Sequence, residues 1–340
     1  MLTADVHPNE PSGRLALMKF LGEDAAKYAE DNNVNVLVVP NLNPIGFEVN
    51  TRLNPQYLDV NRGARTEKEA KEKSIERAEE SVAFMKMIDE EIVQEGRPLA
   101  YAGDFHEMQK ADKYIFAAQA LKEGKNTPEA AEYSNGFFVM VVKALGEVGN
   151  IFAQKIIDAA TAEGTGMTAA TDEEIYEEKN YGGKLPTTFT GYGMVVSYMQ
   201  DVMDDQLQAK LNKTIQRMVK DLRDQPNDNL NIQFTVNTDK TKKLSEMTED
   251  EWQEWKGNLQ EAFKEDSIEG YLQELQILRD SRGVASITEP PADDFEPKVL
   301  VASQLAAVNA IMDHAVELAQ KLRLAFTPNT LGSKKDPTPS

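Results

Sequence analysis

A short apolar run at residues 34–39 (VNVLVV) most constrains how this chain can fold. The run is rich in β-branched residues, is too short for an ordinary helix and is followed by Pro40, so it predicts a buried strand. The preceding segment, 14–32, follows Ser12, a residue type suited to an N-cap, and predicts a helix. Its apolar residues at helical spacing are Leu15, Met18, Leu21 and Ala25. A helix between strands is the βαβ unit of an α/β protein.

Two further segments continue this alternation. Residues 66–95 carry one apolar stripe, with Lys and Glu at most other positions, which is typical of an amphipathic helix with a solvated face. Residues 99–107 (LAYAGDFHE) predict a second buried strand, which brings His106 to its end. Between these segments, residues 41–47 (NLNPIGF) predict a loop from their Asn, Pro and Gly content. Loops that leave strand ends commonly carry function.

Composition excludes several classes of protein. The chain has 340 residues, 41% hydrophobic and 28% charged, as expected of a soluble globular protein with a sizeable core. No apolar run approaches the ~20 residues that cross a bilayer, so we expect no membrane span. The net charge of −20 disfavours sequence-independent binding of nucleic acid, which needs clustered Lys and Arg. Because the chain has no Cys, any metal must bind to His, Asp or Glu.

His7 and Glu10, three residues apart, can place an imidazole nitrogen and a carboxylate oxygen on one ion. Pro8 and Pro11 stiffen the backbone around them. The spacing alone is weak evidence, because Asp and Glu make up 57 of 340 residues, about one in six. The alternative is a surface histidine beside a solvated acid. With only three histidines in the chain, a metal site that needs two of them can be built in few ways.

Four stretches in order resemble the zinc carboxypeptidases of the carboxypeptidase A type and the related aspartoacylase and succinylglutamate desuccinylase group. Residues 7–10 (HPNE) are similar to the H-x-x-E ligand pair, and residues 43–47 (NPIGF) to the N-P-x-G-[FY] segment. Arg52, followed by residues 59–62 (DVNR), is similar to the arginine and D-x-N-R signature. His106 then falls where the family has its third zinc ligand.

The resemblance implies one zinc ion, bound by His7, Glu10 and His106. Residues 285–291 (ASITEPP) resemble the strand that carries the family's catalytic glutamate, here Glu289, and residues 299–324 resemble its long terminal helix. The remaining roles that the resemblance implies are oxyanion stabilisation by Arg52 and binding of a substrate carboxylate by Asn61 and Arg62. The alternative for these last three residues is a structural salt bridge in a loop. The family's mobile tyrosine would be Tyr181 or Tyr192, although neither lies in a matching motif.

The implied fold is α/β, with a mixed, largely parallel central sheet flanked by helices. The implied activity is a zinc metallocarboxypeptidase that cleaves the C-terminal amide bond of small peptides with a zinc-activated water and a Glu general base. One alternative is an N-acyl amino acid deacylase of the aspartoacylase or succinylglutamate desuccinylase type. Another is a metal-free pseudoenzyme that acts as a binding module. We expect no nucleic acid or membrane partner, and the oligomeric state is open.

Two departures from the family pattern concern domain organisation. Only six residues precede His7, where the family has an edge hairpin, a helix and a strand. His106 and Glu289 are 183 positions apart, which predicts a helical insertion at about 108–282 that overhangs the cleft. Within it, residues 137–162 and 194–223 are expected to be helical, Thr248 and Glu251 to form a capping box, and residues 232–236 to form a short strand. We therefore expect one catalytic domain at 1–326 and a disordered tail at 327–340.

The first residues show no basic region followed by an apolar one, so the sequence predicts no secretory signal in this chain. This favours the cytoplasm. The alternative is an exported protein, if the N-terminus is truncated.

Overall fold

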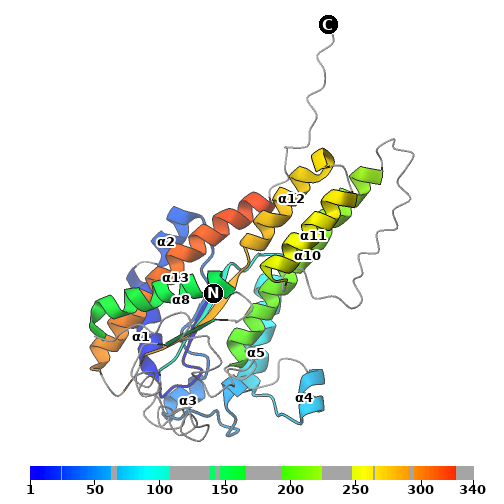
Figure 1. Ribbon diagram of the computed structural model, residues 1–340. Helices are drawn as coiled ribbons and strands as arrows, with labels where there is room; N and C mark the ends of the chain where they lie inside the picture. The colour runs from blue at the N-terminus through cyan, green and yellow to red at the C-terminus, as the bar shows by residue number, and fades with distance from the viewer. Residues whose placement is uncertain are drawn as a thin grey trace, which may run out of the picture. The chain divides into compact units, whose positions relative to one another are not determined.

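The computed structural model shows a β-sheet and several helices (Figure 1). The described residues are 1–23, 25–62, 67–107, 138–141, 146–165, 193–223, 247–262, 265–290, 292 and 295–326. The residues predicted as a second short strand, 232–236, the tyrosines Tyr181 and Tyr192, and the tail predicted to be disordered lie outside these ranges.

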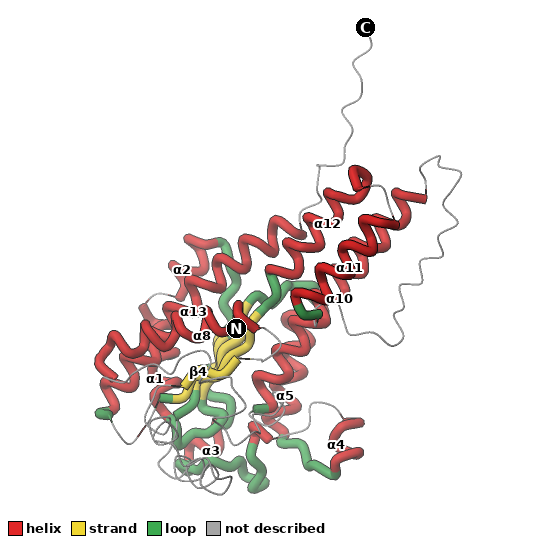
Figure 2. Tube along the Cα trace, viewed as in Figure 1, coloured by secondary structure: helices red, strands yellow, loops and turns green. Residues whose placement is uncertain are grey.

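The described strands form a five-stranded sheet, drawn in yellow in Figure 2. Its strand order is β2-β1-β3-β5-β4. The strands are β1 (Leu2–Ala4), β2 (Val38–Val39), β3 (Tyr101–Phe105), β4 (Phe138–Val141) and β5 (Val284–Glu289). The first three pairings in this order are parallel, and β4 pairs with β5 antiparallel. The predicted α/β class with a mixed, largely parallel sheet is therefore confirmed.

The register of the parallel strands aligns their carboxyl ends. Ala4 is paired with Phe105, and Phe105 with Thr288, so β1, β3 and β5 end at one edge of the sheet. Strands β1 and β3 are buried along their whole length, and β5 is buried up to Thr288. Fully buried parallel strands of this kind need helices on their faces to exclude water.

α-Helices form most of the remaining described elements. They are α1 (Pro11–Glu23), α2 (Ala25–Asn32), α3 (Pro44–Glu48), α4 (Glu67–Lys73), α5 (Glu79–Ile88), α8 (Gly146–Ala160), α10 (Met194–Arg223), α11 (Glu249–Ala262), α12 (Glu265–Asp280) and α13 (Pro297–Phe326). Shorter turns are the 3₁₀ helix η1 (Val60–Arg62) and the π-helical turns η2 (Asp89–Gln94) and η4 (Thr161–Thr165).

Several predicted elements differ from the observed ones. The predicted buried strand at 34–39 forms only the two-residue β2, which is half-buried because it is an edge strand of the sheet. The single helix predicted at 14–32 is observed as α1 and α2. The segment 66–95 is not one helix but α4, α5 and η2, because the chain turns between α4 and α5, where Ser74 has a φ of 52°. Residues 137–162 are not wholly helical, since 138–141 form the strand β4. The predicted loop at 41–47 contains α3, whose Asn43 accepts a hydrogen bond from the Gly46 N–H at 3.0 Å. Helix α1 begins at Pro11, so Ser12 lies inside the helix and is not its N-cap.

The chain divides into two compact units. The first comprises Met1–Val202 and Gly283–Glu317 and contains the whole sheet. The second comprises Met203–Arg282 and Leu318–Ser340, and its core includes the fully buried Trp252. In the second unit, the predicted capping box opens α11: the Glu251 N–H donates to Thr248 Oγ1 at 3.3 Å and the Thr248 N–H to Glu251 Oε2 at 2.7 Å.

Helix α13 is long and apolar enough over Pro297–Lys321 to cross a membrane, judged by length and composition alone. This segment is not one continuous apolar run, because polar residues interrupt it. Several apolar side chains of this helix are buried inside the protein, namely Leu300, Val308 and Ile311. The core helix of a soluble protein passes the same test, so the finding is weak evidence for a membrane span.

Gly13 allows α1 to lie directly on β3. A Cβ atom at this position would lie 2.6 Å from the Phe105 Cβ and 2.8 Å from the Phe105 carbonyl oxygen. Because the obstructing carbonyl belongs to the backbone of a central strand, it cannot rotate away as a side chain could. The same helix contains Gly22, which is exposed and has no neighbour within 4 Å of the corresponding position.

We therefore expect Gly13→Ala to lower the free energy of unfolding by roughly 1–3 kcal/mol, the usual cost of overpacking a core. The matched change Gly22→Ala should be neutral or raise it by up to ~1 kcal/mol, because alanine favours helix. Urea denaturation followed by circular dichroism measures both variants. Equal stability of the two variants would show that α1 does not pack on β3 this closely.

Candidate metal centre

Three predicted site residues are brought together by the ends of the parallel strands. His7 lies three residues beyond β1, His106 follows β3 directly, and Glu289 is the last residue of β5. The His106 N–H donates to the carbonyl oxygen of Thr288 at 2.8 Å, so the chain beyond β3 stays beside the end of β5. Ligand sites of α/β proteins commonly lie beyond the carboxyl ends of the strands.

The backbone leaves β1 through an unusual conformation that turns it toward α1. Asp5 has a φ of 53°, and its buried carboxylate forms an ion pair with Arg14 on α1, with Nε and Oδ2 2.6 Å apart. Burial raises the pKa of Asp5 to about 7, although Arg14 opposes this shift. The Glu10 N–H then donates to the His7 carbonyl oxygen at 2.9 Å, which closes the turn between the two predicted ligands.

His7, Glu10 and His106 form a buried cluster around the Glu10 carboxylate. The His7 Nδ1 lies 3.1 Å from Glu10 Oε1, and the His106 Nδ1 lies 2.8 Å from Glu10 Oε2. The two imidazole rings are 4.8 Å apart between centroids and are inclined at 60°. One nitrogen or oxygen atom from each residue lies within 4.8 Å of the others, so the group could hold a metal ion.

The opposite nitrogen of each histidine faces a carboxylate. The His7 Nε2 lies 3.0 Å from Asp59 Oδ1, and the His106 Nε2 lies 2.8 Å from Asp104 Oδ2. Thr3 Oγ1 donates to the other oxygen of Asp104 at 2.7 Å. A carboxylate on one ring nitrogen fixes the orientation and tautomer of an imidazole and leaves the other nitrogen for a metal. In both histidines the nitrogen left for the metal is Nδ1.

Asp59 and Asp104 lie within the sequence segments 59–62 and 99–107, but neither was predicted to have a role at the site. The signal for Asp104 was present, because residues two apart on a strand point to the same face, and Asp104 precedes His106 by two. No comparable signal exists for Asp59, which is 52 positions from His7 and reaches it through the fold.

The electrostatic environment of the cluster favours a cation. Burial disfavours the charged form of Glu10, but His106 and His7 outweigh it and hold the pKa of Glu10 well below its usual range. Burial likewise disfavours charged His106, but Asp104 and Glu10 outweigh it and raise the pKa of His106 well above its ordinary value. Carboxylates buried around two imidazoles therefore stabilise positive charge at this point, which a divalent ion would supply.

The donor set also fits a metal ion. Two imidazoles and one carboxylate are a ligand set of catalytic zinc sites. The His7 Nδ1 is buried and has no hydrogen-bond partner among the described residues, although Glu10 Oε1 lies 3.1 Å away. A buried nitrogen that lacks a hydrogen-bond partner is costly unless another group, such as a metal ion, binds it.

Arg52 forms two ion pairs in the same cluster. Its Nη1 lies 3.0 Å from Glu10 Oε1, and its Nε lies 3.3 Å from Asp59 Oδ2. About a third of its side chain (34%) is exposed, so the guanidinium borders solvent. These ion pairs have the geometry expected if Arg52 forms a structural salt bridge, which was the alternative to a catalytic role. Stabilisation of an oxyanion by Arg52 stays a prediction.

Asn61 and Arg62, predicted to bind a substrate carboxylate, differ in exposure. Asn61 is buried, with its Nδ2 3.3 Å from the His106 Nε2 and its Oδ1 accepting a hydrogen bond from the Val195 N–H at 3.4 Å. A Cβ at Gly193 would lie 2.7 Å from Asn61 Oδ1, so the asparagine packs closely on the start of α10. Arg62 is exposed, and its Nη1 donates to the Asn61 carbonyl oxygen at 3.3 Å.

Glu289, the predicted general base, is half-buried at the end of β5 and is paired with Phe138 across the antiparallel edge. It immediately follows Thr288, to whose carbonyl oxygen the N–H of the predicted ligand His106 donates a hydrogen bond. The backbone of the predicted base therefore lies beside that of a predicted metal ligand.

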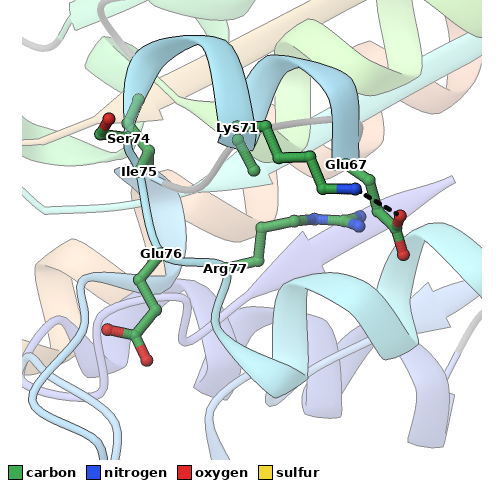
Figure 3. Close-up of a pocket in the computed structure, with 7 residues that line it drawn as sticks. Glu67, Lys71, Ser74, Ile75, Glu76 and Arg77 are labelled. Carbon is green, nitrogen blue, oxygen red and sulfur yellow. Dashed lines mark ion pairs between the residues drawn. The ribbon is translucent and has the colours of Figure 1, made fainter.

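A separate open pocket of ≈ 420 Å³ lies on α4 and the segment that follows it (Figure 3). It is lined by residues between Glu67 and Arg77, and Lys71 forms an ion pair with Glu67 at 3.8 Å across it. None of the predicted site residues lines this pocket, so we assign it no part in the metal centre.

Comparison with known proteins gives no family assignment. No family model and no curated protein sequence matches the chain. Among solved structures, it is similar to a proposed metallopeptidase from Shewanella denitrificans OS217, with 12% identity, a TM-score of 0.45 and coverage of 93% of this chain and 74% of that one. Proposed metallopeptidases from Shewanella baltica OS155 and Shewanella amazonensis SB2B each give 13% identity, a TM-score of 0.43 and coverage of 92% and 75%. Similarity at this level carries no inference about activity.

We expect the protein to bind one zinc ion per chain and His106→Ala to retain well below one equivalent, because the change removes a ligand. Elemental analysis after loading with zinc and gel filtration measures the content. His314→Gln is the matched control, since this histidine lies on α13 against Phe152, with ring centroids 4.3 Å apart. Full zinc retention by His106→Ala would refute the ligand assignment.

Proposed function

We propose that this protein is a zinc-dependent hydrolase that cleaves an amide bond next to a free carboxylate, as a carboxypeptidase does. The observation that carries the proposal is the buried group of His7, Glu10 and His106 at the strand ends, with Asp59 and Asp104 on the opposite nitrogens of the histidines. Buried carboxylates are expensive unless they are paired or bind a cation.

A zinc ion held there would act as a Lewis acid toward a carbonyl group and lower the pKa of a water molecule. Glu289, on the neighbouring strand end, would take a proton and pass it to the leaving amine as general base and then acid. Arg52 would offer positive charge at the solvent border of the cluster, where an oxyanion develops. Arg62 would bind the substrate carboxylate, because an exposed guanidinium matches a carboxylate bidentately.

The buried position of Asn61 supports a modified assignment within this proposal. Its amide oxygen already accepts a hydrogen bond from Val195, and its amide nitrogen lies near His106. We therefore assign Asn61 to the wall of the site, where it supports His106 and carries the backbone carbonyl that Arg62 contacts. Direct binding of the substrate carboxylate then falls to Arg62.

The substrate class is the finer part of the proposal. An N-acyl amino acid deacylase would use the same zinc chemistry and the same carboxylate contact. The residues 43–47 (NPIGF) and the spacing from Arg52 to Arg62 are closer to the carboxypeptidase pattern, so a small peptide with a free C-terminus is the favoured substrate.

The first experiment separates an enzyme from a binding module. Zinc-loaded wild-type protein is incubated with a mixed library of short peptides and N-acyl amino acids, and the products are identified by mass spectrometry. We expect loss of single C-terminal residues, abolished by a chelator and reduced by Glu289→Gln at least 100-fold, in keeping with the ~10²–10⁴-fold contribution of a general base. Release of acyl groups alone would show that the protein is an N-acyl amino acid deacylase. Absence of any metal-dependent product would favour the metal-free binding module.

The second experiment examines the carboxylate contact. Arg62→Ala should weaken cleavage of free-acid peptides tenfold or more, since a hydrogen bond to a charged group is worth ~1.5–3 kcal/mol, and should spare the matching C-terminal amides. Arg97→Ala, which removes another exposed arginine, serves as the control. Equal losses on acids and amides would show that Arg62 has only a structural role.

A further inference from the structure

Gln304, on α13, is fully buried and uses both ends of its side-chain amide. Its Nε2 donates to the carbonyl oxygen of His106 at 2.8 Å, and its Oε1 accepts from Thr288 Oγ1 at 3.0 Å. The two partners lie on the ends of neighbouring strands. One is the predicted metal ligand, and the other directly precedes the predicted general base, Glu289.

These bonds act where the regular sheet pairing stops. The pairing of β3 with β5 ends at Phe105 and Thr288, so His106 and Glu289 are the first residues beyond the paired register. There, the His106 N–H bonds to Thr288 and its carbonyl bonds to Gln304. Gln304 thus anchors the backbone of the ligand to the strand of the base, from a helix 198 positions away in sequence.

Packing alone does not require a glutamine at this position. The neighbouring buried residues of α13 that pack inward are mostly apolar, namely Leu300, Ala307, Val308 and Ile311. Burying a primary amide is unfavourable unless its hydrogen bonds are made, whereas an apolar side chain of similar volume would fill the space at no such cost. The specific use of the amide is therefore its pair of bonds to the two strand ends.

We propose that Gln304 is a positioning residue that fixes the distance between the metal ligand His106 and the base Glu289. The inference deepens the proposed function and rests on it. Side chains that support a catalytic group must hold it within a fraction of an ångström of its working position. Gln304 would do so through the His106 backbone carbonyl and the Thr288 hydroxyl, without touching the metal or the substrate.

The test uses Gln304→Met, which keeps the length of the side chain and removes both bonds. Hydrogen–deuterium exchange should become faster in peptides that contain His106 and Glu289, more than in peptides from the rest of α13. Zinc affinity, measured by competition with a chromophoric chelator, should fall about tenfold, as is typical for loss of an outer contact to a metal site. In steady-state kinetics, kcat should fall while KM stays unchanged.

Ser303→Ala is the matched control, because Ser303 is equally buried on the same helix and its hydroxyl has no hydrogen-bond partner among the described residues. It should leave exchange, zinc affinity and kcat unchanged. If Gln304→Met does not fold, Thr288→Val replaces it, since this change keeps the volume, removes one bond and should give smaller shifts of the same sign. Gln304→Glu should bind zinc more weakly than Gln304→Met, because a carboxylate oxygen would face the His106 carbonyl.

The readouts separate failure of this inference from failure of the proposed function. Hydrogen exchange needs neither metal nor substrate, and zinc affinity needs no activity, so both test Gln304 even if the protein hydrolyses no peptide. Unchanged exchange at His106 and Glu289 in Gln304→Met, or the same zinc affinity as in wild type, would overturn the positioning role. A loss of zinc affinity of equal size in Ser303→Ala would overturn it as well.

Discussion

The buried carboxylate of Glu10 is the interaction on which the metal centre depends. Its Oε1 lies near the His7 Nδ1 and the Arg52 Nη1, at 3.1 and 3.0 Å. Its Oε2 lies 2.8 Å from the His106 Nδ1 and accepts a hydrogen bond from the Glu107 N–H at 3.1 Å. A carboxylate removed from water is tolerated only when such partners replace its hydration. Removing one partner of a buried ion pair typically costs ~3–5 kcal/mol. The segments that carry His7, Arg52 and His106 are therefore held in place together through Glu10.

Glu107 extends this dependence from the ligands to the helix behind them. Its backbone N–H donates to Glu10, and its side chain accepts a hydrogen bond from the Ser12 N–H in the first turn of α1. The amide groups in the first turn of a helix have no partner within the helix, and a carboxylate there also interacts favourably with the helix dipole. Glu107, which directly follows the predicted ligand His106, thus fixes the start of α1, the helix that directly follows the predicted ligand Glu10. The close contact of Gly13 with Phe105 brings the same two segments together from the apolar side.

Sequence patterns correctly predicted those elements that depend only on residues close together in the chain. Three elements follow from spacing within a few residues: the long helix at 194–223, the capping box of Thr248 and Glu251, and the strand that directly precedes His106. The four residues of β4 were predicted as helix because so short an apolar run has no distinctive period. Their assignment depends on antiparallel pairing with β5, which lies more than 140 positions away.

The candidate site likewise contains residues that the sequence made predictable and contacts that it did not. The spacing of His7 and Glu10 was visible, and the motif resemblance added His106, but the orienting contacts of Asp59 and Gln304 join residues 52 and 198 positions apart. The burial of Asn61 was equally hidden, because it arises from contact with Gly193 and Val195 around the start of α10. Residue type predicted which groups could perform the chemistry. Only the fold shows which of them are exposed to a substrate and which hold the others in place.

Arg52 illustrates why that distinction matters for interpreting mutations. Its guanidinium forms ion pairs with Glu10, a predicted metal ligand, and with Asp59. Asp59 in turn faces the Nε2 of His7, a second predicted ligand. Removing Arg52 would therefore change the charge balance of the ligands before any oxyanion forms, and would leave two carboxylates less well compensated. A loss of activity in an Arg52 variant thus has two physical causes that kinetics alone cannot separate. Only a variant that keeps full zinc affinity while kcat falls would assign this arginine to the reaction itself, because the metal would then report an undisturbed Glu10.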